Sequence, residues 1–279
     1  MQFRLETVGR TRDSEEFRVN SHRLAQFARA LDDENPAHLE GRVAPPVFAH
    51  VPIMQTMVET IGLATDAAPL HGEHDFHFHR PIAPGQRLFS LSTLQAIRQS
   101  KAGVVLIVRS ESKDADGQTA CVQYSTCLVT GGSIDAERGE AAPARPHLSQ
   151  GREVGRMDCA LTDDVSRRYA DAARDYSPYT MLPEAARKMG FPAPILHGMC
   201  TLGYASRVVV DQGCGGDSRR LKRLGGRFTH PVFVTPGQRL TTSLSEIGVG
   251  EDGRRLLRFE TTDRDGNTVI RNGFAEVSA

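Results

Sequence analysis

The sequence of 279 residues lacks a net charge, because 34 Lys and Arg side chains balance 34 Asp and Glu side chains. A protein without excess positive charge has no field to hold nucleic acid or an anionic membrane. The sequence also lacks a continuous apolar run close to the roughly 20 residues that cross a bilayer. Its first residues, MQFRLETVGR, lack the apolar core of a signal peptide. We therefore expect a cytoplasmic protein that binds a small molecule or another protein, and neither nucleic acid nor membrane.

Cysteine is scarce, and no two cysteines form a CxxC pair. An odd set of five thiols is typical of reduced, structural cysteines and not of a disulfide framework or a zinc site. Histidines gather in HGEHDFHFHR, residues 71–80, but no cluster of carboxylates or cysteines completes a tetrahedral ligand set there. The sequence therefore predicts no metal and no cofactor. The cysteines are Cys121, Cys127, Cys159, Cys200 and Cys214.

The chain contains an internal duplication. FHRPIAPGQRL, residues 78–88, recurs about 150 residues later as FTHPVFVTPGQRL, residues 228–240. Each copy is followed by alternating strand-like runs that meet at an Asp-Gly turn, at 116–117 and at 265–266. Each copy is preceded by an apolar stretch that opens with proline, residues 44–62 and 193–212, and both stretches read as buried helices. The three marks recur in the same order, which indicates two homologous halves.

These marks predict an α+β protein of two similar units. Each unit has a short leading segment, a small helix ending in an Asp turn, one long apolar helix and several antiparallel strands that wrap it. We expect residues 1–132 to form the N-terminal half, 133–151 a linker rich in Gly, Ala, Pro and charge, and 152–279 the C-terminal half. Pairing of one strand edge from each half would make one continuous sheet and remove two exposed edges.

Two short motifs carry a resemblance to a known family. The first is Asp33-Glu34-Asn35-Pro36-Ala37-His38, and the second is PILHGM, residues 194–199. Their order, followed by Phe-x-x-Pro and Pro-Gly, resembles the MaoC-type dehydratases and (R)-specific enoyl-CoA hydratases. The resemblance spans nearly the whole chain outside the linker. It implies a tandem, or double, hot-dog fold, with a long helix wrapped by a curved antiparallel sheet in each half.

The resemblance also implies an activity and its residues. Members hydrate 2-enoyl thioesters and dehydrate 3-hydroxyacyl thioesters reversibly, so the expected partner is an acyl-CoA or an acyl-carrier thioester. By resemblance, Asp33 and His38 jointly activate the water and Asn35 supports them. The proline between the two side chains ends the helix, so both can turn toward one point. Which of the two is the base stays open, as do the acyl chain length and the stereochemistry.

The two halves carry unequal versions of the motifs. The second half reads DYSPYT, with Asp175 and Pro178 retained but Ser177 and Thr180 in place of the Asn and the His. Threonine does not accept a proton near neutral pH, so we place the working pair in the first half and treat the second hexapeptide as degenerate.

The donor to the thioester oxygen is less determined by the sequence. A backbone N–H at the start of a buried helix suits this role. The candidates are Ala49 and His50 in the first half, slightly favoured, and Gly198 in the second, where the His-Gly-Met motif is intact.

Two other functions stay open at this point. One is a hot-dog thioesterase, which would aim a water at the carbonyl carbon and has no need of the paired histidine. The other is a non-catalytic acyl-binding or partner subunit, in keeping with the motif lost from one half. A single chain already supplies a pair of units, and a homodimer of such chains is a further possibility.

Overall fold

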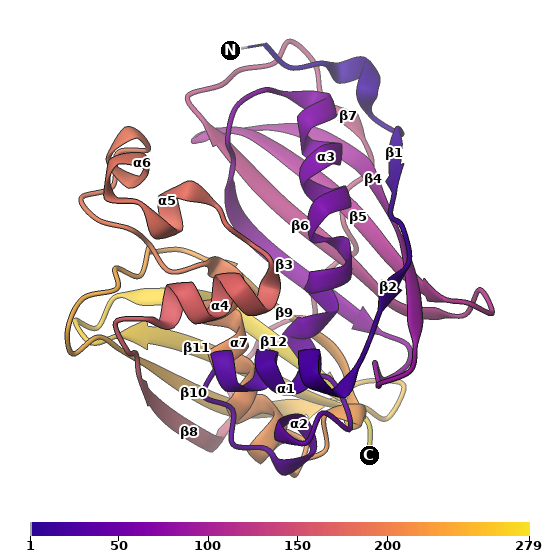
Figure 1. The fold of residues 1–279 in the computed structure, drawn as a ribbon, viewed down its shortest axis with the longest axis vertical. Helices are drawn as coiled ribbons and strands as arrows, with labels where there is room; N and C mark the ends of the chain where they lie inside the picture. Colours follow the sequence, from indigo (N-terminus) through magenta and orange to yellow (C-terminus); the bar gives the residue numbers. More distant parts are fainter. Residues whose placement is uncertain (1) are drawn as a thin grey trace.

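The computed structural model describes residues 2–279, and within them twelve strands form one continuous antiparallel sheet (Figure 1). The strands are β1 (Thr11–Asp13), β2 (Phe17–Arg18), β3 (Leu70–Phe78), β4 (Arg87–Ser100), β5 (Gly103–Asp114), β6 (Thr119–Thr130), β7 (Arg138–Gly139), β8 (Arg152–Ala160), β9 (Leu221–Phe228), β10 (Arg239–Val249), β11 (Arg255–Asp263) and β12 (Thr268–Val277). Their order is β1-β4-β5-β6-β3-β9-β12-β11-β10-β8, with β2 and β7 paired to β4. The second half mirrors the first, which is the arrangement expected of a duplicated chain.

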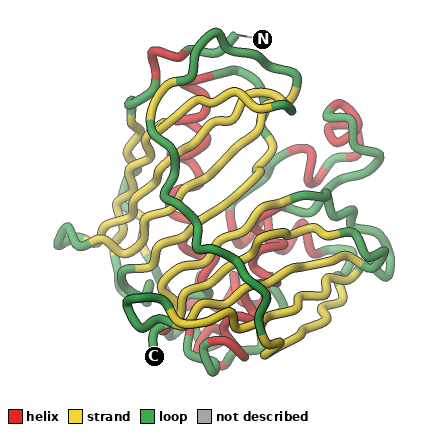
Figure 2. The backbone as a smooth tube through the Cα atoms, turned by 180° about the vertical axis from the view of Figure 1, so that it is seen from behind, coloured by secondary structure: helices red, strands yellow, loops and turns green. Residues whose placement is uncertain are grey.

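The helices cover one face of this sheet, as the views from the two sides show (Figures 1 and 2). They are α1 (Ser21–Ala30), α2 (Pro36–Leu39), α3 (Met54–Ala64), α4 (Val165–Ala173), α5 (Pro178–Met181), α6 (Pro183–Lys188) and α7 (Gly198–Val208). α3 packs against β4 and β5, and α7 packs against β8, β9 and β10. Each half is therefore one central helix wrapped by its own strands.

The central helix of the first half begins as a 3₁₀ segment, Pro46–Ile53, and continues as α3. Residues 46–64 are long and apolar enough to cross a membrane, so the expectation that no run approaches that length was wrong. Of this stretch, 67% is buried inside the protein, as expected of a core helix. The cytoplasmic location stays a prediction.

The central helix of the second half begins later than its proline predicts. Pro194 and Ile195 lie in extended chain, where Ile195 bridges Phe233, and α7 begins at Gly198. The proline restricts the residue before it to extended conformations, and the isolated bridge holds the chain there. The prediction of a helix over 193–212 was therefore four to five residues too long at its start.

The two Asp-Gly turns are built alike, as the duplication predicts. Gly117 and Gly266 adopt φ values of 77° and 82°, which favour glycine. In each hairpin the carboxylate before the turn accepts two backbone N–H groups; Asp114 Oδ1 accepts from 116 and 118, and Asp263 Oδ1 accepts from 265 and 267. The hairpins β5–β6 and β11–β12 therefore have the same turn structure.

All five cysteines are free and buried, in agreement with the prediction of structural thiols.

The linker crosses the outer face of the sheet between the halves (Figure 2). Between β7 and β8 it has no helix or strand. It is tied to the seam at two points, where the Ala144 carbonyl accepts from Arg223 and where Arg145 pairs with Glu73. The boundaries of the two halves as domains stay a prediction.

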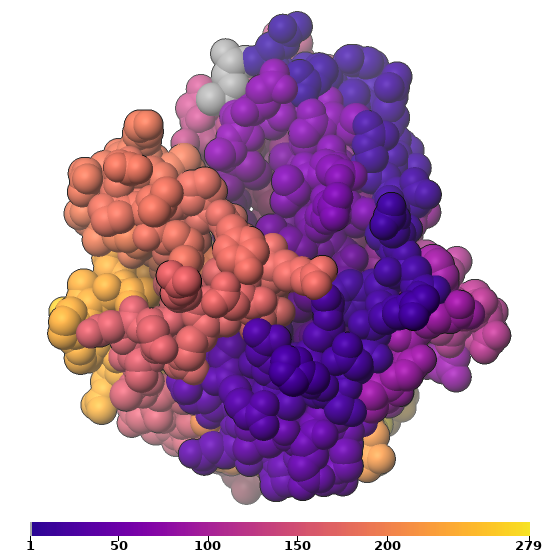
Figure 3. Space-filling view, viewed as in Figure 1, coloured from indigo at the N-terminus to yellow at the C-terminus, as the bar shows by residue number. Residues whose placement is uncertain are grey.

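The segment with α4, α5 and α6 belongs to the second half but lies against the first. Figure 3 shows this segment, residues 165–190, meeting the N-terminal half along a seam with a recess between them. In the opposite direction, α1 packs on α4, and the end of α1 reaches α7 (Figure 1). The small helices of each half therefore pack against the other half.

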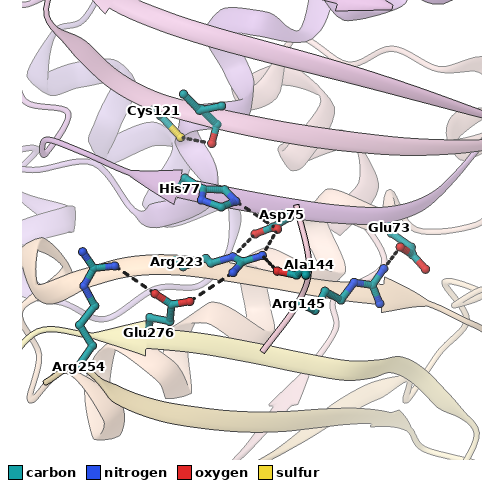
Figure 4. Close-up of polar contacts among 10 residues, drawn as sticks. Glu73, Asp75, His77, Cys121, Ala144, Arg145, Arg223, Arg254 and Glu276 are labelled. Atoms are coloured by element: carbon teal, nitrogen blue, oxygen red, sulfur yellow. Dashed lines mark hydrogen bonds and ion pairs between the residues drawn. The ribbon is translucent and has the colours of Figure 1, made fainter. Parts of the chain in front are cut away.

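The seam of the sheet is the antiparallel pair β3–β9, in which Asp75 lies opposite Gly225. Figure 4 shows the ion pairs around it: Arg223 of β9 crosses the seam to Asp75 of β3 at 2.7 Å and also contacts Glu276 of β12, in its own half, at 3.3 Å. The side chains of Arg223 and Asp75 are 11% and 10% exposed. Because these charges are buried together, the junction of the halves depends on their pairing.

Candidate active site

The predicted pair in the first half is in direct contact. Asp33 Oδ2 lies 2.6 Å from His38 Nδ1, and the two residues are 5% and 1% exposed. A carboxylate only accepts hydrogen bonds, so in the neutral ring Nδ1 carries the hydrogen and Nε2 presents a lone pair. That lone pair faces Ser218 Oγ at 3.0 Å. The structure therefore brings Asp33 and His38 together and adds a serine from the second half.

The local sequence explains the geometry of this pair. Asp33 Oδ1 accepts the backbone N–H of Asn35 at 3.0 Å, and Asn35 Oδ1 accepts that of Ala37 at 3.0 Å. The second bond caps α2, and Pro36 occupies the first helical position, where its missing N–H is not needed. The single turn of α2 then carries His38 back over Asp33.

The second half anchors the residue that precedes the pair. Asp32 has a left-handed φ of 50°, an uncommon conformation for a residue with a side chain. Tyr204 of α7 donates to Asp32 Oδ2 at 2.6 Å, and the Arg168 guanidinium of α4 donates to both carboxylate oxygens at 2.9 and 3.2 Å. Two helices of the second half therefore hold the turn from which Asp33 projects.

Two further contacts from the second half complete this anchoring. Asn35 Nδ2 donates to the carbonyl of Gly216 at 2.8 Å. On α7, Gly203 lets the end of α1 approach, because an added Cβ would lie 2.7 Å from methyl groups of Leu31. Nothing in the motif predicted these contacts. The glycine-rich run at 213–216 was the available signal, and by itself it reads only as a helix end.

A small pocket of about 30 Å³ adjoins the pair. Ser218 lines it and is also the residue that touches His38. Ala49 lines it from the 3₁₀ start of the central helix. The remaining lining comes from residues 43–46, 78–82, 219, 221 and 222. The site thus has walls from both halves.

The degenerate motif of the second half keeps the backbone of the first. Asp175 Oδ1 accepts the backbone N–H of Ser177 at 3.1 Å, as Asp33 does with Asn35. Thr180 occupies the place of His38 and lies 2.9 Å from His197 Nε2. His197 Nε2 is also 3.0 Å from the Asp175 carbonyl oxygen. The matched turn is therefore present, but its carboxylate has no imidazole partner at position 180.

A cavity of about 730 Å³ opens at this second motif. Met54, Met57 and Ile61 of α3 form one apolar wall, and Leu196 and Phe228 of the second half form another. Four histidine rings and Asp175 are among its polar groups, and α7 begins at its edge. None of the residues lining this cavity lines the small pocket beside Asp33 and His38.

Burial disfavours the charged form of His50, His71 and His197 in this cavity. Burial lowers the pKa of His50 to about 4 and of His71 to about 3, against the opposing charge of Asp175. Burial also lowers the pKa of His197. His71 contacts His74, whose other nitrogen lies 3.0 Å from Gln123. Among residues 2–279, no group of three or more side chains is arranged to hold a metal ion.

The oxyanion candidates lie in two different spaces, the small pocket and the large cavity. Ala49 lines the small pocket beside the Asp33–His38 pair, whereas the side of the helix that carries His50 lines the large cavity. Gly198 lies in the large cavity with Thr180 and does not meet the pair. Packing of the two halves therefore keeps the Asp33–His38 pair apart from the intact His-Gly-Met motif, which lines the large cavity.

Comparison with known proteins agrees with this architecture. A family model described as "MaoC like domain" matches residues 148–267, and one described as "FAS1-like, dehydratase domain region" matches residues 6–122. The 3-hydroxyacyl-thioester dehydratase Y of Mycobacterium tuberculosis is 30% identical over 227 residues, covering 78% of this chain and 76% of that protein. The chain belongs to the MaoC-like dehydratase family.

One further relative and one solved structure extend the comparison. The probable enoyl-CoA hydratase 2 of Dictyostelium discoideum is 37% identical over 210 residues, with 74% of this chain and 69% of that protein covered. A solved structure from Mycobacterium tuberculosis, titled as a double hot-dog fold, superposes with a TM-score of 0.66 at 13% identity, covering 97% of this chain and 96% of that chain. The resemblance and the fold predicted from the sequence are both confirmed.

Proposed function

We propose that this chain is a hydro-lyase that adds water reversibly to 2-enoyl thioesters, with Asp33 and His38 as its catalytic pair. The relatives named as thioester dehydratase and enoyl-CoA hydratase support the reaction class. The observation that carries the site is the 2.6 Å contact between Asp33 and His38 within the Asp-x-Asn-Pro-x-His turn. The matching turn of the second half offers Thr180 in place of the imidazole, which supports placing catalysis in the first half.

The hydrogen-bond pattern favours His38 as the base. In hydration, Nε2 removes a proton from water while the water oxygen bonds to the β-carbon of the enoyl group. Asp33 orients the ring through Nδ1–H and stabilises the positive charge that the imidazole gains. The electron pair of the double bond moves toward the thioester oxygen, and the α-carbon then takes the proton back from Nε2. Dehydration follows the same path in reverse.

The developing charge on the thioester oxygen needs a hydrogen-bond donor. Ala49 is the oxyanion candidate that shares a pocket with Ser218, so we assign the role to the backbone at this helix start. The pocket volume of about 30 Å³ suffices for a water molecule but not for an acyl chain.

The mouth of the small pocket suits a phosphate-bearing handle. His79, Arg80, Arg219 and Lys222 line this pocket, and Arg80 and Arg219 also pair with Asp114 and Asp217. Guanidinium groups match phosphate oxygens in geometry and charge, and ammonium groups supply a point charge. These cations support CoA as the handle of the thioester.

A second candidate function is hydrolysis of the thioester, and one observation favours it. Asp33, His38 and Ser218 form a row with contacts of 2.6 and 3.0 Å, the arrangement of an Asp-His-Ser triad. In that reaction Ser218 Oγ would attack the carbonyl carbon, its proton would pass to Nε2, and the thiol would leave. Water would then cleave the acyl-serine ester.

One pair of assays separates these functions. Loss of enoyl-thioester absorbance with 2-enoyl-CoA reports hydration, and release of free thiol reports hydrolysis. We expect absorbance loss without thiol release, abolished by His38→Ala and by Asp33→Asn, since acid–base groups contribute at least about a hundredfold. Thr180→Ala is the matched control and changes little. Unimpaired hydration in either pair variant would refute the site, and no turnover by the folded wild type would favour a non-catalytic acyl-binding subunit.

A further inference from the structure

A buried amide in the first half has no part in the mechanism above. Gln123 lies on β6, is 0% exposed, and lines neither the small pocket nor the large cavity. Its Nε2 donates to the Ala49 carbonyl at 2.8 Å, although the two residues are 74 positions apart in the sequence. Gln123 therefore connects the sheet to the residue at which the proposed function places the donor to the thioester oxygen.

The helix start at Ala49 lacks one backbone donor. In a 3₁₀ helix each carbonyl accepts from the N–H three residues later. For Ala49 that residue is Pro52, which lies inside the segment Pro46–Ile53 and has no N–H. The proline ring also clashes with the carbonyl four residues before it in a regular α-helix, which favours the 3₁₀ form here. The amide of Gln123 thus supplies, from the sheet, the donor that position 52 cannot.

The orientation of this amide is determined by its partners. The Ala49 carbonyl only accepts, so the amide nitrogen of Gln123 faces it and Oε1 points the other way. Oε1 lies 3.0 Å from His74 Nε2 and 3.4 Å from His50 Nδ1. Burial lowers the pKa of both rings, which favours neutral imidazoles that carry their hydrogen on the nitrogen facing Oε1. With partners at both ends, the amide is held toward Ala49.

The second half is built differently at both positions. α7, Gly198–Val208, contains no proline. Counted from the Asp-Gly turns, Asn272 corresponds to Gln123, but it is exposed and has a left-handed φ of 54° where the register of β12 shifts. The interior proline and the buried amide therefore occur together in the half that holds the Asp33–His38 pair.

We propose that Gln123 is a positioning residue for hydration, which orients the helix start at Ala49 toward the thioester oxygen by holding the Ala49 carbonyl. This inference rests on the proposed function. Gln123 does not line the small pocket, so it acts through Ala49 and not on the substrate. Without the amide the 3₁₀ segment loses a fixed point, and misplacement of a reacting or stabilising group by about 1 Å costs up to about a hundredfold in rate.

Steady-state kinetics of Gln123→Met in the full chain test this role. Methionine keeps the length of the side chain and removes the amide. We expect kcat for 2-enoyl-CoA hydration to fall about tenfold to a hundredfold and KM to change by less than about twofold, because the donor acts on charge that develops in the transition state. A folded Gln123→Met protein with the wild-type kcat would overturn the proposal.

A second buried glutamine provides the matched control. Gln238 is 3% exposed, its amide donates to the Phe233 carbonyl at 3.3 Å within the second half, and it lines neither the small pocket nor the large cavity. We expect Gln238→Met to unfold at lower urea and to keep the wild-type kcat. An equal loss of kcat in the two variants would assign the effect to general destabilisation and overturn the positioning role.

Pro52→Ala offers a rescue that a packing defect would not show. Alanine at position 52 supplies the N–H that the Ala49 carbonyl otherwise takes from Gln123. In the double variant Gln123→Met/Pro52→Ala we expect kcat to return to within about threefold of Pro52→Ala alone. A double variant as slow as Gln123→Met would refute the route through the Ala49 carbonyl.

Two further measurements keep the test decisive. If Gln123→Met does not fold, Gln123→Asn replaces it, because an amide shortened by one methylene falls short of Ala49 and should lower kcat in the same way; an undiminished kcat there would overturn the proposal. Wild-type turnover separates the two proposals. Hydration at equal rates by wild type and Gln123→Met removes only the positioning role, whereas a folded wild type without hydration removes the proposed function and the positioning role with it.

Discussion

Tyr204→Phe tests whether the second half positions the catalytic pair. The phenol donates to Asp32 at 2.6 Å and thereby holds the left-handed turn before Asp33. A hydrogen bond to a charged group contributes about 1.5–3 kcal/mol. Arg168 still pairs with Asp32 in the variant, so we expect the turn to loosen without detaching. Misplacement of the pair should lower kcat for 2-enoyl-CoA hydration by about tenfold, because about 1.4 kcal/mol corresponds to that factor.

The matched control is Tyr176→Phe. This phenol also donates to an aspartate, Asp171, at 3.2 Å, but the residue is 60% exposed and lies away from the pair. We expect no change in kcat and a loss of stability below about 0.5 kcal/mol. Urea unfolding of both variants separates stability from catalysis. A Tyr204→Phe protein that unfolds at lower urea yet keeps the wild-type kcat would show that the contact is structural only, which would refute the positioning argument.

Three further outcomes follow from the structure. Ser218→Ala removes the hydroxyl 3.0 Å from His38 Nε2 and should leave the hydration rate within about tenfold of wild type, since a water takes its place. If the wild type instead releases thiol and the variant loses all activity, Ser218 is a nucleophile. Arg223→Met leaves the buried Asp75 carboxylate with His77 alone and should lower the unfolding free energy by on the order of 3 kcal/mol in urea titration, whereas no change would contradict the role of the seam network. The pKa of His50 in the folded protein, about 4, lies below the ordinary value of 6.5, so the unfolded chain binds more protons between pH 4 and pH 6.5. The free energy of unfolding should therefore fall as the pH is lowered from 6.5 to 4. A thermal midpoint that stays constant over this pH range would contradict the burial of His50 as a neutral ring.

The sequence predicted the parts of the fold that depend on local pattern. The repeated Pro-Gly-Gln-Arg-Leu and Asp-Gly marks correctly indicated two α+β halves, because turn chemistry and strand alternation act over a few residues. Pairing of the halves into one sheet was also expected, since each half otherwise leaves an edge. The start of α7 was predicted four to five residues too early, because the extended chain before Gly198 depends on a bridge to Phe233, a neighbour distant in sequence.

For the site, the spacing in Asp33-Glu34-Asn35-Pro36-Ala37-His38 was enough to predict that a carboxylate and an imidazole would meet. An Asx turn, a cap and a proline at the first helical position are local effects, and each contributes to the contact between the two side chains. What surrounds the pair is a property of tertiary packing alone. Ser218, Gly216, Tyr204 and Arg168 arrive from positions more than 130 residues away, and no short-range pattern encodes their approach.

The sequence by itself thus determined the family, the two-unit fold and the identity of the catalytic candidates, because these depend on local residue types and their order. The tertiary structure decided how those candidates are distributed. Crossing of the small helices between halves sets the intact Asp-His pair beside a pocket of about 30 Å³ and the degenerate turn beside a cavity of about 730 Å³. Volume and shape arise where side chains from both halves meet, so the separation of Asp33 and His38 from the cavity of about 730 Å³ could be read only from the folded chain.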